Sequence, residues 1–168
     1  MKKILVALLM MAPMSLFAQK FAHFNMANVL PEMEEYKTAS AEVQKLASQY
    51  QEEYDRLIKE YQTKAEEFQK LSDEGQTAQA ILQSKANDLQ KMEQSIQDFS
   101  QASQQDLQKQ QSEKMESIQN KVMAAIKKIG EAGNYIYVMD ISSGAVPFIN
   151  ENLSTDVTAQ VRAELGIK

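Results

Sequence analysis

Few residues of this 168-residue chain have the type and spacing that catalysis requires. His23 is the only histidine, and it shares one face of an expected strand with Phe21, which favours a packed side chain over a general base. Neighbouring carboxylates such as Glu52 and Glu53 diverge by about 100° on a helix and typically form a solvated face. No Gly-rich phosphate loop precedes a lysine, and no Ser/His/Asp arrangement is recognisable. The sequence therefore predicts no enzyme, no cofactor site and no metal site.

Composition excludes further kinds of chemistry. Cysteine is absent, so disulfides, a thiol nucleophile, a thiolate metal site and lipid attachment through cysteine are all ruled out. The chain has 18 basic and 23 acidic residues, and such a surface is poorly suited to phosphate backbones or anionic lipid. We therefore expect no nucleic-acid partner and at most transient membrane contact.

The first residues are typical of a secretory signal peptide. Lys2 and Lys3 precede an apolar run from Ile4 to Met14, and Ala18 supplies a small residue for cleavage. This run is shorter than the roughly 20 residues that cross a bilayer. We expect residues 1–18 to be removed, which leaves 16 basic against 23 acidic residues and a formal charge of −7.

Residues 32–129 are predicted to be helical, because they contain no proline and their apolar residues repeat every seven positions. Gly75 divides this region into two stretches. The first stretch repeats Tyr54, Tyr61 and Phe68, and the second repeats Leu82, Leu89 and Ile96. Such repeats are typical of helices that pack side by side.

The two stretches pair in one antiparallel register. Partners in an antiparallel pair have residue numbers with a constant sum. Three apolar pairs add up to 150, namely Phe68 with Leu82, Tyr61 with Leu89, and Tyr54 with Ile96, and Tyr50 with Phe99 adds up to 149. A helical hairpin explains this constant sum, although one continuous helix is the alternative, since an internal glycine costs only about 1 kcal/mol.

The ends of the two helices have recognisable signals. The turn is predicted near residues 72–78, with Gly75 in the left-handed conformation and Thr77 as the cap of the second helix. Pro31 is expected at the first position of the first helix, followed by Glu34 and Glu35. The second helix is longer, and its last apolar residues are expected to enter a separate body: Val122, Ala125, Ile126 and Ile129.

That body is predicted from residues 19–30 and 130–168, with residues 31–129 as the hairpin arm. Strands are expected at 20–26, 135–140 and 145–150, which are β-branched and aromatic runs between Gly, Ser and Asn. The strand at 135–140 is apolar on both faces, as in strands that are covered on both sides. A last helix is expected to start at Ser154 or Thr155 and to bury a stripe that includes Val157, Val161 and Leu165.

A body of about 50 residues is small for an independent core. Self-association would bury its strand edges and apolar faces. The residues predicted to form this oligomerisation body are Phe21, Phe24, Ile136, Val138, Val146, Phe148, Val157 and Val161.

Three stretches of the sequence recur together in a known family: "FAHFNMANVLPEMEEYKTA", the heptads of "EYDRLIKEYQTKAEEFQKL", and "YIYVMDISSGAVPFINENLSTDVT". Through them the chain resembles the Skp/OmpH family of periplasmic chaperones over its whole mature length. The last stretch is the most specific, because a strand ending in Val-x-Asp, a turn, a second strand and a Ser/Thr-Asp-Val/Ile-Thr helix start follow in that order, at 138–140, 146–149 and 154–158.

The resemblance implies an α+β, mostly helical protein. It implies a jellyfish-like homotrimer, with a small oligomeric β-body and long antiparallel helical hairpins, or tentacles, around a cavity. It further implies a holdase that binds unfolded outer-membrane proteins without ATP in the periplasm of a Gram-negative bacterium. The acidic balance departs from the strongly basic members of the family, which puts steering of clients by positive charge in doubt.

Holding an unfolded chain calls for many weak, adaptable contacts, to which Met and Tyr side chains are suited. The residues predicted to face a client lie off the hairpin seam and are Tyr36, Ile58, Ile81 and Met115. The alternative for each is a core position, because aromatic residues at helical spacing usually pack inside. At the level of function, the alternative is a structural or adaptor coiled-coil protein of the cell envelope.

Overall fold

The computed structural model describes residues 19–167, and the predicted signal peptide at 1–18 lies outside them. The chain divides into two compact units. We call residues 34–119 the hairpin and the remaining described residues, up to 33 and from 120, the body. Each unit is described by itself below.

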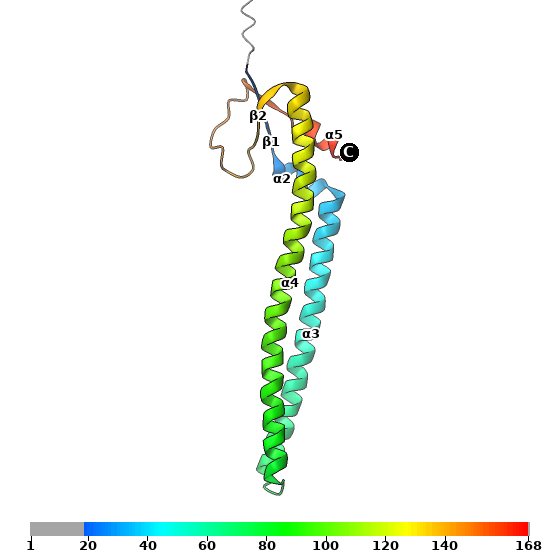
Figure 1. Cartoon of the computed structure of the whole chain (residues 1–168), viewed down its shortest axis with the longest axis vertical. Helices are drawn as coiled ribbons and strands as arrows, with labels where there is room; N and C mark the ends of the chain where they lie inside the picture. The colour runs from blue at the N-terminus through cyan, green and yellow to red at the C-terminus, as the bar shows by residue number, and fades with distance from the viewer. Residues whose placement is uncertain (1–18, 168) are drawn as a thin grey trace, which may run out of the picture. The chain divides into compact units, whose positions relative to one another are not determined.

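The hairpin consists of two long antiparallel helices. Helix α3 spans Glu34–Asp73, and helix α4, which spans Gln79–Gly133, contributes its residues up to 119. The two helices run side by side in opposite directions (Figure 1), and Lys114 pairs with Glu42 while Lys85 pairs with Glu67. Residue numbers therefore fall along α4 as they rise along α3, which confirms the predicted hairpin and excludes one continuous helix.

The hairpin turn depends on a glycine. Gly75 has a φ of +66°, a conformation that other residues adopt only with strain, and so it fulfils the role predicted for it. The prediction of Thr77 as the helix cap was wrong. Ala78 holds the cap position, because its carbonyl accepts the hydrogen bonds of the Ile81 and Leu82 amides.

The first helix also begins later than predicted. Pro31 lies in a short 3-10 helix, η1 (Leu30–Glu32), which follows helix α2 (Met26–Val29). The backbone of Met33 is extended, so the chain changes direction before α3 begins at Glu34. Glu34 and Glu35 occupy the first turn of α3, where a negative charge is favourable.

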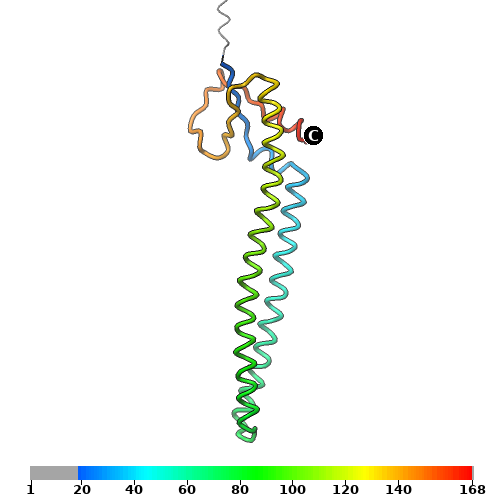
Figure 2. The backbone as a smooth tube through the Cα atoms, in the orientation of Figure 1, coloured from blue at the N-terminus to red at the C-terminus, as the bar shows by residue number. Residues whose placement is uncertain are grey.

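A three-stranded parallel sheet organises the body. Strand β1 (Lys20–Phe24) lies in the centre, between β2 (Tyr135–Asp140) and β3 (Ser154–Asp156). Figure 2 shows this N-terminal strand, in blue, beside segments from the end of the chain. The body therefore cannot form until the two ends of the chain have met.

Two predictions for the C-terminal segment were wrong. Residues 145–150 form no strand, and the third strand is instead Ser154–Asp156, where a helix start was expected. Pairing with β1 explains this, because Phe21, Ala22 and His23 align with the three polar residues of β3. Helix α5 (Thr158–Glu164) begins later than predicted, and Asp156 accepts a hydrogen bond from the Thr158 amide at its start.

Helices α4, α2 and α5 and strand β1 contribute most of the buried side chains of the body's core. Its α4 residues are buried as expected, namely Val122, Ala125, Ile126 and Ile129. Ala22 and Phe24 of β1, Val29 of α2, Met33, and Val157 and Val161 at α5 are also buried. An ion pair between Arg162 of α5 and Glu32 of η1 and another between Lys128 and Glu164 lie on the surface of this core.

We predict opposite effects for alanine at two glycines. Gly75→Ala should lower the free energy of unfolding by about 1 kcal/mol, because an L-residue at a φ of +66° is strained even where nothing lies within 4 Å of its Cβ. Gly130→Ala is the matched control. Gly130 lies inside α4, and a Cβ added there would make an ordinary 3.6 Å contact with Val138. This substitution should therefore raise the free energy of unfolding by about 0.5–1 kcal/mol. Denaturant unfolding measures both changes, and equal effects of the same sign would contradict this account of the turn.

Candidate functional site

The seam between α3 and α4 is only half closed. No residue of the 40-residue helix α3 is fully buried. Ile96 and Ile118, at 8% and 3% exposure, are the buried residues of the hairpin's α4 segment among those the structure describes. Of the predicted seam residues, Ile96 is therefore buried, while the other five are half-buried: Tyr54, Tyr61, Phe68, Leu82 and Leu89.

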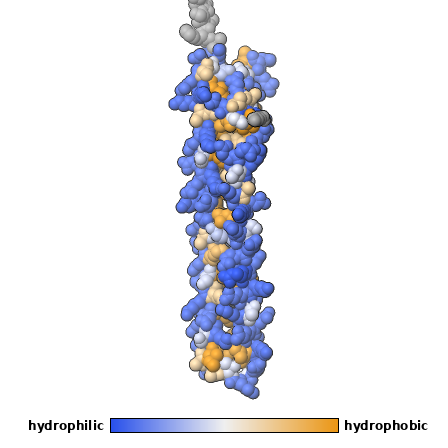
Figure 3. All heavy atoms as spheres, turned by 90° about the vertical axis from the view of Figure 1, so that its right-hand side faces the viewer, coloured by the Kyte–Doolittle hydropathy of each residue, from blue (hydrophilic) through white to orange (hydrophobic). Residues whose placement is uncertain are grey.

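The seam between α3 and α4 is half closed for a geometric reason. Two helices with no third layer contact each other along one line, so the side chains on that line stay open to solvent on both flanks. Hydrophilic residues dominate the surface in Figure 3, with apolar residues in separate patches between them. The hairpin therefore keeps half-buried apolar side chains within reach of another molecule, and Ile81 is its one exposed large apolar residue among those described.

Polar contacts fix the register of this open seam. The Tyr50 hydroxyl donates to Asp106 over 2.7 Å, and the Tyr50 ring meets Phe99 edge to face, with centroids 5.9 Å apart. Tyr50 and Phe99 are one of the predicted apolar pairs, whereas Asp106 was missed because a carboxylate is not expected at a seam. The hydrogen bond to Asp106 raises the pKa of Tyr50, and the Lys85 ammonium holds the pKa of Glu67 below its usual range.

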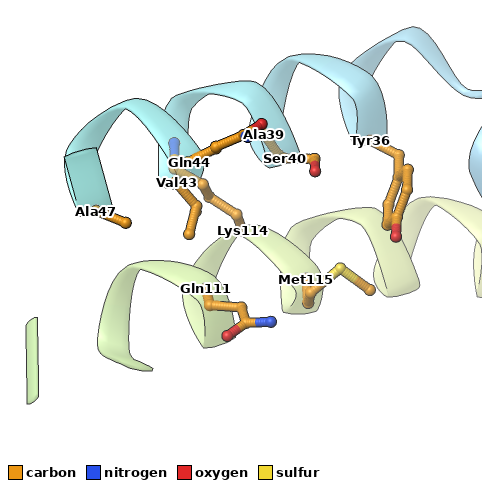
Figure 4. Close-up of a pocket in the computed structure, with 9 residues that line it drawn as sticks. All are labelled: Tyr36, Ala39, Ser40, Val43, Gln44, Ala47, Gln111, Lys114 and Met115. Carbon is orange, nitrogen blue, oxygen red and sulfur yellow. The ribbon is translucent and has the colours of Figure 1, made fainter. Parts of the chain in front are cut away.

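A pocket of about 300 Å³ lies between α3 and α4 within the hairpin (Figure 4). Alanine and serine at positions 39, 40 and 47 leave space that larger seam residues fill elsewhere. Its lining is completed by Tyr36, Val43, Gln44, Gln111, Lys114 and Met115. Small residues at heptad positions were the sequence signal for this pocket, but its volume depends on how closely the helices approach.

The four residues predicted to face a client lie at different places in the structure. Tyr36 and Met115 come from different helices and line the same pocket (Figure 4). Ile81 lies beyond the hairpin turn and is 51% exposed, whereas Ile58 is half-buried in α3. Neither Ile58 nor Ile81 lines the pocket, so the four residues do not form one site.

The body exposes apolar side chains of its own. Ile136, Tyr137 and Met139 of β2 are 46%, 58% and 37% exposed, and Phe148 and Leu153 in the following loop are 78% and 74% exposed. The Phe21 ring stacks on Tyr137 with centroids 6.3 Å apart. Because β2 pairs only with β1, its other edge is open among the described residues. Both faces of β2 thus remain partly uncovered in a single chain.

The residues predicted for oligomerisation fall into three groups. Ile136 and Phe148 are exposed, and Phe21, Val138 and Val146 are half-buried. Phe24, Val157 and Val161 are buried inside their own chain, at 2%, 0% and 0% exposure. Val138 and Ile136 also border an open groove of about 620 Å³ beside the last turns of α4.

The polar residues of the body serve its structure. His23 is 5% exposed, and its Nδ1 lies 2.8 Å from the Ser154 hydroxyl of β3. Asp140 accepts hydrogen bonds from the Ser142 amide and hydroxyl and from the Met26 amide, so it fixes the turn as predicted and also the start of α2. Hydrogen bonds from Thr158, assisted by His23, hold the pKa of Asp156 below its usual range.

Residues 19–167 contain neither a cluster of metal-ligating side chains nor a membrane-spanning helix. No group of three His, Cys, Asp or Glu side chains could hold a metal ion. No helix in this part of the chain combines the length and the hydropathy needed to cross a membrane.

The fold is that of a helical hairpin with an open seam and a small sheet-centred body. The chain belongs to the OmpH-like outer membrane protein family, whose model matches residues 20–165. A crystal structure from Caulobacter crescentus CB15, described as a candidate OmpH-like outer membrane chaperone, has a similar fold, with a TM-score of 0.73 and 18% identity. The match covers 88% of this chain and 83% of that one. Comparison with curated proteins gives no match.

The Tyr50–Asp106 contact predicts a pH dependence of stability. Because the pKa of Tyr50 is raised above its ordinary 10.0 in the folded state, the unfolded chain loses this proton first. The free energy of unfolding should therefore fall as the pH rises above about 10, and the fall should be smaller in Asp106→Ala. Ultraviolet titration of tyrosinate together with denaturant unfolding measures both effects, and Tyr50→Phe is the control that removes this titration. An unchanged pKa of Tyr50 in Asp106→Ala would contradict the assignment.

Proposed function

We propose that this protein is a periplasmic holdase that binds unfolded outer-membrane proteins and prevents their aggregation before insertion. The observation that carries the proposal is the half-open seam of the hairpin, where five of six predicted seam residues stay half-buried. Membership of the OmpH-like family supports a chaperone in general terms. The signal peptide at 1–18 would direct the chain to the periplasm.

The contacts available on the hairpin suit such a client. An unfolded β-barrel protein has apolar residues scattered along its chain and no fixed shape, so a single deep pocket could not recognise it. Tyr and Met side chains along the seam can adapt to many sequences, and the total affinity would come from several weak contacts. Because this mode of binding involves no nucleotide or metal, the activity would be independent of ATP.

Aggregation measurements test the holdase proposal. A urea-unfolded outer-membrane β-barrel protein is diluted into buffer with the mature chain, residues 19–168, without nucleotide. Light scattering should decrease in proportion to the added chain and approach baseline at a small molar excess. Unchanged scattering at molar excess would overturn the proposal, and capture of one folded envelope protein at fixed stoichiometry would instead support an adaptor.

Self-association would cover the exposed apolar residues of the body. Burying a side chain such as Phe148 contributes about 1.5–3 kcal/mol, and the open edge of β2 offers backbone groups to another strand. We propose that three copies share these surfaces, which would hold several hairpins around a common space.

Sedimentation analysis tests this assembly. Phe148→Ser should weaken association at least about tenfold, because it removes an apolar side chain that is 78% exposed in the single chain. Ile81→Ser is the matched control, since Ile81 is an exposed residue of the hairpin and its loss should leave association unchanged. A wild-type chain that sediments as a compact monomer, or equal effects of the two variants, would contradict the proposed interface.

A further inference from the structure

A row of carboxamide side chains follows one face of α4. Nine of them alternate at spacings of four and three residues, which keeps them in line on a helix with 3.6 residues per turn. They are Gln83, Asn87, Gln90, Gln94, Gln97, Gln101, Gln104, Gln108 and Gln111. We call this row the carboxamide stripe.

The carboxamide stripe is exposed and uncharged. All nine residues are exposed, and Gln83 and Gln94 make only exposed hydrogen bonds within the helix, to Asn87 and Asp98. At 100° per residue, the stripe lies about 150° around α4 from the seam positions that include Leu82 and Met92. Most of the stripe therefore faces away from α3, whereas Gln111 at its end also lines the pocket between α3 and α4.

The chemistry of this row matches that of a peptide backbone. Each carboxamide has two N–H donors and a carbonyl acceptor, the same groups that a peptide unit presents. An extended strand offers one N–H and one C=O on the same edge every second residue. A row of carboxamides can pair with such an edge whatever the sequence of the strand.

The length of the stripe also fits an extended segment. From residue 83 to residue 111 it spans about 42 Å along the helix axis. A membrane-spanning β-strand of 9–11 residues is about 30–37 Å long when extended. One such strand is short enough to lie along the stripe over its whole length.

We propose that the carboxamide stripe binds the backbone edge of an extended strand of an unfolded outer-membrane protein. This inference rests on the proposed holdase function and names the surface of α4 that takes part in it. The absence of charge in the stripe favours this occupant, because an anionic or cationic partner would leave its own charge unpaired there. The backbone is the feature that all unfolded clients share.

Two quadruple variants test the role of the stripe. The stripe variant replaces Gln94, Gln97, Gln101 and Gln104 by alanine. The control variant replaces Gln49, Gln51, Gln62 and Gln69, which are equally exposed but lie on α3. Alanine favours a helix at these exposed positions, and far-UV circular dichroism verifies that both variants fold. In the aggregation and binding measurements with an unfolded β-barrel protein, the stripe variant should bind about tenfold more weakly, and the control should change less than about twofold.

A modified peptide identifies the group that is bound. The probe is a labelled 11-residue peptide of zero net charge with alternating apolar and polar residues, compared with the same peptide N-methylated at every residue to remove its N–H donors. N-methylation should weaken binding to the wild-type chain and should have little effect on binding to the stripe variant, because the two changes remove the same interaction. Independent, additive losses would overturn the proposal.

The outcomes separate this inference from the proposed function. If the wild-type chain suppresses aggregation and the stripe variant does so equally well, the stripe is a solvated face and the inference is wrong, while the holdase function stands. If the stripe variant changes the sedimentation of the chain without client, the stripe joins copies of the protein and the inference is likewise wrong. If the wild-type chain itself fails to suppress aggregation, the proposed function is wrong.

Discussion

Two helices that pack only on each other cannot enclose their own apolar side chains. Along α3 this leaves no fully buried residue, and in the hairpin segment of α4 only Ile96 and Ile118 are buried. The buried core lies instead in the body, where helix, strand and loop surround Val122, Val157 and Val161. Cross-hairpin contacts such as Tyr50–Asp106 and Glu42–Lys114 then define the register that a weak apolar seam leaves loosely specified. The same geometry that limits stability keeps the seam accessible.

The topology of the body explains how the chain accommodates a hairpin that buries few of its own apolar side chains. Strand β1 pairs in parallel with β2, and parallel neighbours need a crossover connection between them. Here the whole hairpin lies within that connection, since α3 and α4 separate β1 from β2 in the chain. Strand β1 precedes the hairpin in the chain and β2 follows it, so pairing of these strands brings together the segments on either side of the hairpin. The body thus supplies most of the buried core, and the hairpin supplies the accessible seam.

Sequence patterns predicted the elements whose signals are local. The heptads of both helices, the left-handed Gly75 and the strand at 135–140 follow from periodicity and residue type, and the first strand, predicted at 20–26, is β1 at 20–24. Two failures were local, namely the helix cap at Thr77 and the helix start at Pro31, and the others involve long-range pairing. Residues 145–150 look like a strand but find no partner in the single chain, whereas the polar segment Ser154–Asp156 becomes a strand because β1 pairs with it and His23 meets Ser154. The pocket beside Tyr36 and Met115 also depends on long-range packing, because the small residues Ala39, Ser40 and Ala47 of α3 form a pocket only where α4 lies opposite them.

The two faces of α4 offer different chemistry to the same kind of molecule. Its seam side carries half-buried apolar residues such as Leu89 and Met92, and the opposite side carries the uncharged carboxamide stripe. An unfolded β-barrel strand likewise has apolar side chains and unpaired backbone groups, and both promote aggregation when they are left exposed. Apolar contacts alone would leave the backbone edges free to pair with another strand. A chain with an acidic surface could therefore hold such a client without attraction between opposite charges, if apolar and amide contacts act together along the length of one helix.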